Sequence, residues 1–264
     1  MKIGLTQMDI VWENREKNKE TVRQLLEKGK ALHVELLVFP EMTLTGFTMN
    51  TAYAGEELLF SDTLHFFKQM SLDYEMAIAF GFVEDFGGEY YNKLMIVSGG
   101  KLIYDYDKIH PFNYGEEGKH YVGGNEVKTV ELHHMKLSGF VCYDLRFPEL
   151  FQAVSNVANI ILVIANWPKE RVVQWETLLK ARAIENQCYV IGVNRKGCGD
   201  GIVYTESSMA FDPLGEKLTK PHCKSELMVV DVNPAHVKNV RQKYPFKKDR
   251  RVDLYCSFYN TMES

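Results

Sequence analysis

The chain has 264 residues, enough for one large domain or two small ones, and its 45% hydrophobic and 25% charged residues are typical of a folded globular protein. The formal net charge is −4 and no block of lysine and arginine dominates a segment, which argues against a nucleic-acid-binding surface. The 5 cysteines lack CxxC pairs and metal-ligand spacing, and an odd number cannot all pair within the chain. We therefore expect reduced thiols, a cytoplasmic protein and no metal site.

Targeting and membrane segments are not indicated by the sequence. Residues 1–7 turn polar too early for a signal peptide, and the most apolar internal run, residues 160–165, is far too short to cross a bilayer. No linker, composition shift or internal repeat divides the chain. We therefore expect one domain over residues 1–264, in which residues 235–264 form a C-terminal tail that is first basic and then aromatic.

Strands and helices alternate in the first half of the predicted structure. Short continuous apolar runs predict strands, and apolar residues that recur among charged ones at helical spacing predict helices. In chain order we expect a strand at 2–8, a helix at 14–30, a strand at 35–40, a helix at 58–74, and strands at 76–83, 90–97 and 102–106. The initial strand–helix–strand order implies a crossover connection and a sheet whose faces are covered.

The second half has similar content and follows a long polar loop at 113–125. Loops of that length inside a compact domain are usually functional or disordered. After the loop we expect a strand at 137–141, a helix from Pro148 to about residue 155, a strand at 159–164, a helix at 172–186, and strands at 188–194, 207–212 and 227–232. The sequence therefore predicts an α/β fold.

Cys142 falls where a predicted strand stops and a helix is about to begin. Pro148 suits the first turn of that helix, and Glu149 lies near its positive end. A thiol at such a bend is exposed at the rim of a sheet, and the backbone N–H groups that follow it can face a developing oxyanion. The alternative is that Cys142 is a small buried hydrophobe, as most free cysteines are.

Two other side chains with useful chemistry also lie at the ends of predicted strands. They are Glu41 and Lys108, and ligands of open α/β sheets bind at the carboxyl ends of strands. Glu41 could take the proton of the Cys142 thiol and later give it to a leaving amine, while Lys108 holds an oxyanion. The ammonium would also favour the thiolate. Taken singly, the Glu is more often a helix cap or a surface charge and the Lys is usually solvated, and the pattern does not show that the strand ends meet.

Three segments resemble the signature blocks of the nitrilase (carbon–nitrogen hydrolase) superfamily. They are Phe39-Pro40-Glu41, Tyr106-Asp107-Lys108-Ile109-His110 and Cys142-Tyr143-Asp144-Leu145-Arg146-Phe147-Pro148-Glu149. The blocks occur in the family's order, and the resemblance extends from the strand of Gln7 to Asp231. It implies a four-layer α-β-β-α sandwich.

The same resemblance implies catalytic roles. Glu41, Lys108 and Cys142 match the family's Glu–Lys–Cys triad. Its second active-site glutamate, in the loop after the lysine, is best matched by Glu117, with Glu116 as the alternative; either could instead be a solvated loop charge. The family uses neither a metal nor a cofactor, and it usually dimerises through helices on one outer face. Aromatic residues of the tail are expected to join that contact: Tyr255, Phe258 and Tyr259.

Within the superfamily, the blocks around Cys142, Trp167 and Arg182 resemble the omega-amidase (YafV-like) branch. That branch hydrolyses the terminal amide of small 2-oxo-dicarboxylic acid monoamides, such as 2-oxoglutaramate, and releases ammonia. Such a substrate needs a cation for its carboxylate. Arg146 could provide it through a bidentate contact, or could instead form a structural ion pair with Glu149.

Other candidate pocket residues are less specific. Trp167 and Phe112 could wall the substrate pocket, although aromatic residues at strand ends are more often core, and Tyr143 would contribute its backbone N–H. His110 has no second ligand at metal-binding spacing, so a metal site there is disfavoured. The remaining cysteines are expected to be packing or incidental thiols: Cys188, Cys198, Cys223 and Cys256.

The leading hypothesis is therefore an amidase that works through a Cys142 thioester. The nearest alternatives are a deaminated-glutathione amidase and an N-carbamoyl amine hydrolase. The alternative of a different class is a nonenzymatic binding protein on the same fold. Such a protein would tolerate loss of Glu41, Lys108 or Cys142, and all three are present.

Overall fold

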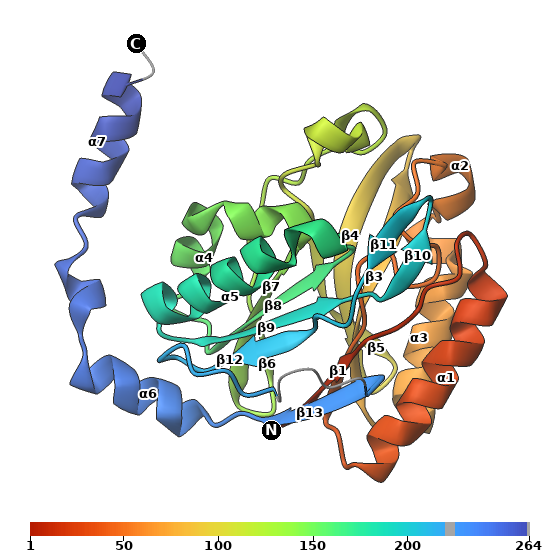
Figure 1. Cartoon of the computed structure of the whole chain (residues 1–264), viewed down its shortest axis with the longest axis horizontal. Coiled ribbons are helices and arrows are strands. Elements are labelled where there is room, and N and C mark those ends of the chain that lie inside the picture. Colours follow the sequence, from red (N-terminus) through yellow and green to blue (C-terminus); the bar gives the residue numbers. More distant parts are fainter. Residues whose placement is uncertain (220–224, 263–264) are drawn as a thin grey trace.

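The computed structural model describes residues 1–219 and 225–262, and the strands of these residues form two main β-sheets. The sheets pack face to face, with helices covering their outer faces (Figure 1). The four-layer α-β-β-α sandwich and the α/β class are therefore confirmed. No helix in the described part of the chain is long and apolar enough to cross a membrane. Cys223 lies outside the described residues.

The first sheet is mixed and has six strands. Their spatial order is β13 (Leu227–Asp231), β1 (Lys2–Thr6), β2 (Leu36–Val38), β3 (Ala77–Phe86), β4 (Glu89–Ser98) and β5 (Lys101–Asp107). β2 pairs in parallel with β1 and β3, so helical crossovers connect these strands, as the strand–helix–strand pattern predicts. Helices α1 (Arg15–Ala31) and α3 (Asp62–Asp73) cover its outer face (Figure 1).

The second sheet has five strands, and its three central strands are parallel. Their spatial order is β12 (Met209–Phe211), β9 (Tyr189–Asn194), β8 (Ile160–Ala165), β7 (Met135–Val141) and β6 (Val130–Leu132). Helices α4 (Pro148–Val154) and α5 (Val172–Asn186) cover its outer face (Figure 1). A two-stranded ribbon of β10 (Gly197–Gly199) and β11 (Ile202–Tyr204) follows β9.

The main hydrophobic core fills the space between the two sheets and holds residues of both. At Gly139 on β7 the sheets come so close that a Cβ would lie 2.0 Å from Leu94 Cδ2 on β4. Tyr104 on β5 crosses the same gap, donating its hydroxyl to the Gly139 carbonyl at 3.1 Å and accepting the Gly139 N–H at 2.9 Å. These contacts fix how the ends of the strands in one sheet face those in the other.

Two predicted elements differ from the structure. The helix expected at 58–74 is interrupted at Ser61, because the Ser61 hydroxyl accepts the Leu64 N–H and caps a new helix; the turn before it is the 3-10 segment η1 (Leu58–Phe60). The C-terminal tail is mostly helical. It contains α6 (Pro234–Lys243), η6 (Phe246–Asp249) and α7 (Val252–Met262).

The short elements were not predicted, because few residues carry each pattern. These are α2 (Thr51–Ala54), β6, β10, β11 and the 3-10 segments η2 (Asn113–Gly115), η3 (Glu117–Lys119) and η5 (Lys169–Arg171).

Candidate active site

Cys142 lies at the sharp strand-to-helix bend that the sequence predicts. Strand β7 ends at Val141, and the 3-10 helix η4 (Cys142–Arg146) begins at the cysteine. The φ angle of Cys142 is +47°, in the left-handed region that residues with a side chain rarely adopt. Strained backbone of this kind is concentrated at functional sites. The bend leaves Cys142 half-buried in the wall of a cavity.

Asp144 connects the Cys142 bend to the end of β5. Its buried carboxylate accepts the Tyr106 hydroxyl at 2.9 Å and the Val141 N–H at 3.1 Å through Oδ2. Its Oδ1 lies 3.0 Å from the backbone N of His110 and 2.9 Å from His110 Nδ1. One carboxylate therefore ties together the segments that carry the cysteine and the lysine.

Glu41, Lys108 and Glu117 form a buried charge cluster behind the cavity. The Lys108 Nζ lies 3.2 Å from Glu41 Oε1 and 2.7 Å from Glu117 Oε2. All three side chains are almost completely excluded from solvent. Two carboxylates face one ammonium, so the ionised cluster carries one net negative charge.

Asn92 and Asn166 hold the carboxylates of this cluster in place. The Asn92 amide donates to Glu41 at 2.8 Å and to Glu117 at 2.9 Å. The Asn166 backbone N–H donates to Glu41 Oε2 at 2.8 Å, and its side-chain amide donates to the Glu41 carbonyl at 2.8 Å. Each oxygen of the Glu41 carboxylate thus has at least two donors, which fixes its orientation.

Electrostatics at the site keep Lys108 charged and disfavour a resting thiolate. Burial alone would lower the pKa of Lys108, but the carboxylates of Glu117 and Glu41 outweigh it and raise that pKa. Burial, together with the charge of Glu41, raises the pKa of Cys142 well above its ordinary value, and Lys108 offsets only part of this. The Lys108 ammonium does favour the thiolate, as expected, but burial of the sulfur and the charge of Glu41 outweigh it, so the net shift is in the opposite direction.

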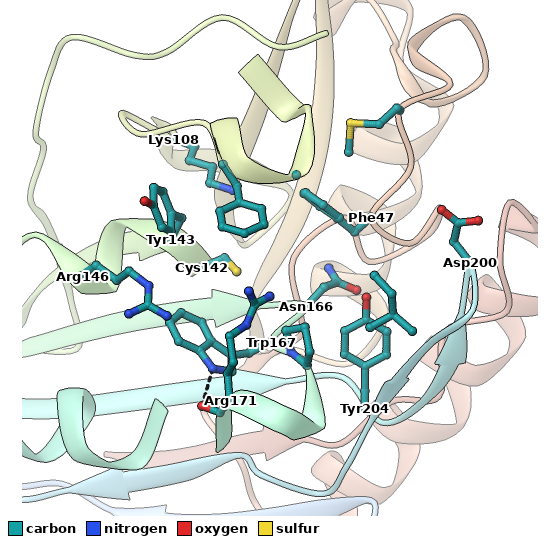
Figure 2. Close-up of a pocket in the computed structure, with 15 residues that line it drawn as sticks. Phe47, Lys108, Cys142, Tyr143, Arg146, Asn166, Trp167, Arg171, Asp200 and Tyr204 are labelled. Carbon is teal, nitrogen blue, oxygen red and sulfur yellow. Dashed lines mark hydrogen bonds between the residues drawn. The ribbon is translucent and has the colours of Figure 1, made fainter. Parts of the chain in front are cut away.

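The cavity in front of Cys142 has a volume of about 150 Å³, enough for a small organic molecule. Figure 2 shows Cys142 and Lys108 at this cavity together with the predicted pocket residues Tyr143 and Trp167. The predicted pocket residue Phe112 lines it as well. Arg146, also predicted as a pocket residue, lines the cavity too. The other residues that line it are Phe47, Met49, Gly115, Asn166, Pro168, Arg171, Asp200, Ile202 and Tyr204.

Two arginines of the cavity wall rest on aromatic rings. The guanidinium carbon of Arg146 lies 5.0 Å from the ring centroid of Trp167, and that of Arg171 lies 5.2 Å from the ring centroid of Phe112. Within residues 1–219 and 225–262 neither guanidinium has an ion pair. The ion pair between Arg146 and Glu149 that the sequence left open is absent from this described part; Glu149 instead accepts the Tyr259 hydroxyl at 3.2 Å.

The two candidate loop glutamates have different surroundings. Glu117 is buried against Lys108 and also accepts the Phe112 N–H at 2.6 Å, whereas Glu116 is exposed and pairs with Lys119 at 2.8 Å. The geometry favours Glu117 as the second active-site glutamate. The catalytic roles of Glu41, Lys108, Cys142 and Glu117 stay predictions.

His110 stacks on Phe147, with ring centroids 3.6 Å apart, and contacts Asp144. Among the residues that the structure describes, no group of three or more histidine, cysteine, aspartate or glutamate side chains is arranged to hold a metal ion. The surroundings of His110 therefore match a role in holding the Cys142 bend.

Sequence reasoning missed several residues of the site. Asn92 lies inside a buried strand, where asparagine is uncommon, and this unusual position could have marked it as a site residue. Asp144 stands in the signature block around Cys142, but its contacts with the end of β5 follow only from the fold. Arg171 and Tyr204 carry no signal in the sequence, because only the fold brings them to the cavity.

The chain is similar in sequence to known proteins. Residues 2–242 match the family model described as carbon–nitrogen hydrolase. The chain is 36% identical to the omega-amidase YafV of Yersinia enterocolitica, over 82% of this chain and 83% of that protein. It is 30% identical to the 2-oxoglutaramate amidase of Bacillus subtilis, over 96% of this chain and 98% of that protein.

A solved structure has the same fold. It is a carbon–nitrogen hydrolase superfamily protein from Xanthomonas campestris with an arsenic adduct in its active site. The TM-score is 0.88 at 29% identity, and the match covers 95% of this chain and 97% of that one.

Proposed function

Because the chain belongs to the carbon–nitrogen hydrolase (nitrilase) superfamily and is an amidase, we propose that it is an omega-amidase. Its substrates would be small 2-oxo-dicarboxylic acid monoamides such as 2-oxoglutaramate, which it converts to the acid and ammonia. The observation that carries the proposal is the buried Glu41–Lys108–Glu117 cluster beside the half-buried Cys142, in a small cavity with two arginines that lack an ion pair within the described chain. The names of the two relatives support the substrate class.

The first half of the reaction forms a thioester. The Cys142 sulfur bonds to the amide carbon while its proton passes to Glu41. Lys108 and the Tyr143 backbone N–H stabilise the oxyanion of the tetrahedral intermediate, a type of contact worth roughly 2.7–4 kcal/mol per donor. The carbon–nitrogen bond then breaks, and Glu41 returns the proton to the leaving ammonia.

The second half hydrolyses the thioester. Glu41 accepts a proton from water as the water oxygen attacks the acyl carbon, with the same donors on the oxyanion. The carbon–sulfur bond then breaks, the acid leaves, and the proton held by Glu41 returns to the sulfur. Glu117 holds Lys108 in place throughout.

The Cys142→Ala variant tests this mechanism. We expect ammonia release from 2-oxoglutaramate to disappear, because no other group in the described cavity wall can form the thioester, while thermal unfolding stays close to that of the wild type. Intact-mass spectrometry of the wild type mixed with substrate and quenched in acid should show an acyl adduct that the variant lacks. Full ammonia release by Cys142→Ala would rule the mechanism out.

A substrate panel separates the alternatives. Rates with 2-oxoglutaramate, deaminated glutathione and an N-carbamoyl amine distinguish the three carbon–nitrogen hydrolase activities. A cavity of about 150 Å³ favours the shortest acyl chain. A nonenzymatic binding protein would bind one of these compounds without hydrolysing it.

We also propose that the protein works as a cytoplasmic homodimer. A reducing compartment keeps the Cys142 thiol available for catalysis. The C-terminal helix α7 has several exposed apolar side chains that a second copy can cover: Val252, Leu254, Tyr255, Phe258 and Tyr259.

A further inference from the structure

We propose that Arg171 binds the carboxylate at the far end of the acyl chain and thereby selects anionic amides. The proposal rests on the omega-amidase function and names the residue that determines its specificity. Sequence reasoning pointed to Arg146 for this role, and the two arginines have different positions relative to Cys142.

The backbone of Arg171 is fixed at the cavity wall. The residue ends the 3-10 segment η5 and immediately precedes helix α5. Its carbonyl accepts the Trp167 indole N–H at 2.7 Å, so the loop after β8 is anchored at this position. Figure 2 shows the Arg171 guanidinium directed toward Cys142.

The guanidinium of Arg171 is arranged to receive an anion. One face lies over the Phe112 ring, 5.2 Å from its centroid, which leaves the N–H edge available for a bidentate contact with a carboxylate. In the described part of the chain no acidic side chain forms an ion pair with it. Asp200 is the one acid among the described residues of the cavity wall, and Figure 2 shows it on the far side from Arg146.

Position across the cavity favours Arg171 over Arg146. Arg146 belongs to the same short helix as Cys142 and packs on the Trp167 ring. Arg171 belongs to a different segment, and the two arginines approach Cys142 from different sides (Figure 2). A linear substrate whose amide carbon bonds to the sulfur carries its carboxylate at the opposite end, and a cation on a segment other than the one that holds the sulfur is placed to meet it.

The test compares an anionic amide with an uncharged one in the full-length enzyme. The variants are Arg171→Gln, Arg171→Lys and Arg146→Gln, and the substrates are 2-oxoglutaramate and valeramide. For Arg171→Gln we expect kcat/KM for 2-oxoglutaramate to fall about 10- to 100-fold, mainly through KM, with a far smaller loss for valeramide. Arg171→Lys should recover part of this loss because it keeps the positive charge. Arg146→Gln should lower kcat/KM for 2-oxoglutaramate less than Arg171→Gln does.

A matched control removes a stacked guanidinium outside the cavity. Arg23 on α1 is exposed and lies over the Phe66 ring, 5.0 Å from its centroid, so Arg23→Gln changes the same chemical group without touching the site. We expect wild-type kinetics with both substrates. Thermal unfolding of each variant checks that all of them are folded.

The results of these assays distinguish the role of Arg171 from the omega-amidase function. The inference is wrong if Arg171→Gln keeps the wild-type preference for 2-oxoglutaramate over valeramide, or if Arg146→Gln loses as much of that preference or more. In either case the omega-amidase function stands. A wild-type enzyme that shows no preference for the anionic amide would overturn the omega-amidase function, and the role of Arg171 with it.

Discussion

At the scale of single residues, burial and the charges around Cys142 set the pKa of its thiol. Burial raises the pKa of the thiol, and the net negative charge of two buried carboxylates that share one ammonium raises it further. We infer that Cys142 rests as a thiol and loses its proton only when it attacks the substrate.

A spectroscopic titration tests this resting state. The difference in absorbance at about 240 nm between wild type and Cys142→Ser reports the thiolate of Cys142 alone. Because the folded protein binds this proton more tightly than the unfolded chain, we expect no thiolate at neutral pH and a rise only above the ordinary cysteine pKa of about 8.5. A difference signal already complete at pH 7 would contradict this.

At the scale of elements, the position of Glu41 depends on strand β3. The Thr43 N–H donates to the Gly81 carbonyl at 3.1 Å, and the Gly81 N–H donates to the Thr43 hydroxyl at 2.9 Å, so the segment after β2 rests directly on β3. A Cβ at Gly81 would lie 2.1 Å from the Met42 nitrogen and 2.6 Å from the Glu41 carbonyl carbon. Only glycine lets the two backbones approach this closely.

The Gly81→Ala variant is therefore expected to displace Glu41. The added methyl group meets backbone atoms, which cannot rotate away, so we expect a loss of about 1–3 kcal/mol in unfolding free energy and at least a tenfold loss in kcat. Urea denaturation and ammonia release measure the two effects.

Gly87→Ala is the control at the turn between β3 and β4. Gly87 has a φ of +64°, and a Cβ added there would meet no heavy atom within 4 Å, so the substitution should cost roughly 1–2 kcal/mol of stability and leave kcat intact. Equal kcat for Gly81→Ala and Gly87→Ala would show that the contact with β3 does not position Glu41.

At the scale of the whole molecule, the site is built by two sheets. Glu41 and Lys108 follow β2 and β5 of the first sheet, while Cys142 and Asn166 follow β7 and β8 of the second. The cavity therefore lies where the strand ends of the two sheets face each other. Helix α7 takes no part in packing the two sheets together, and Figure 1 shows it projecting away from them.

Removal of α7 tests the proposed dimer. Leu254 and Phe258 are 36% and 51% exposed and stand one helical turn apart, so one apolar face of α7 is open to solvent. If a second copy covers this face, a chain ending at Arg250 should have half the mass of the full chain by light scattering. The double variant Leu254→Ser, Phe258→Ser should behave in the same way with the helix kept. An unchanged mass for both would exclude α7 from the contact.

The sequence predicted the longer elements well because their patterns extend over many residues. The helix at 172–186 was predicted with the bounds that α5 has, since apolar and charged residues alternate at helical spacing throughout it. The helix at 58–74 was not predicted with its correct bounds. The hydrogen bond from the Leu64 N–H to the Ser61 hydroxyl starts a new helix, and this local contact leaves no mark on the periodicity. The face-to-face packing of the sheets was inferred from the family resemblance alone, because pairing between distant strands leaves no mark on local pattern.

The sequence by itself determined which residues are the catalytic candidates: Glu41, Lys108 and Cys142 each stand at or just after the end of a predicted strand, and that is a local property of the chain. Tertiary structure alone decided what surrounds them. It buried Glu117 against Lys108, raised the pKa of the Cys142 thiol where a neighbouring lysine had suggested the opposite, and brought Arg171 to the cavity wall. The physical reason is that burial and net charge at a point depend on every segment that reaches it, and these segments come from two sheets distant in sequence.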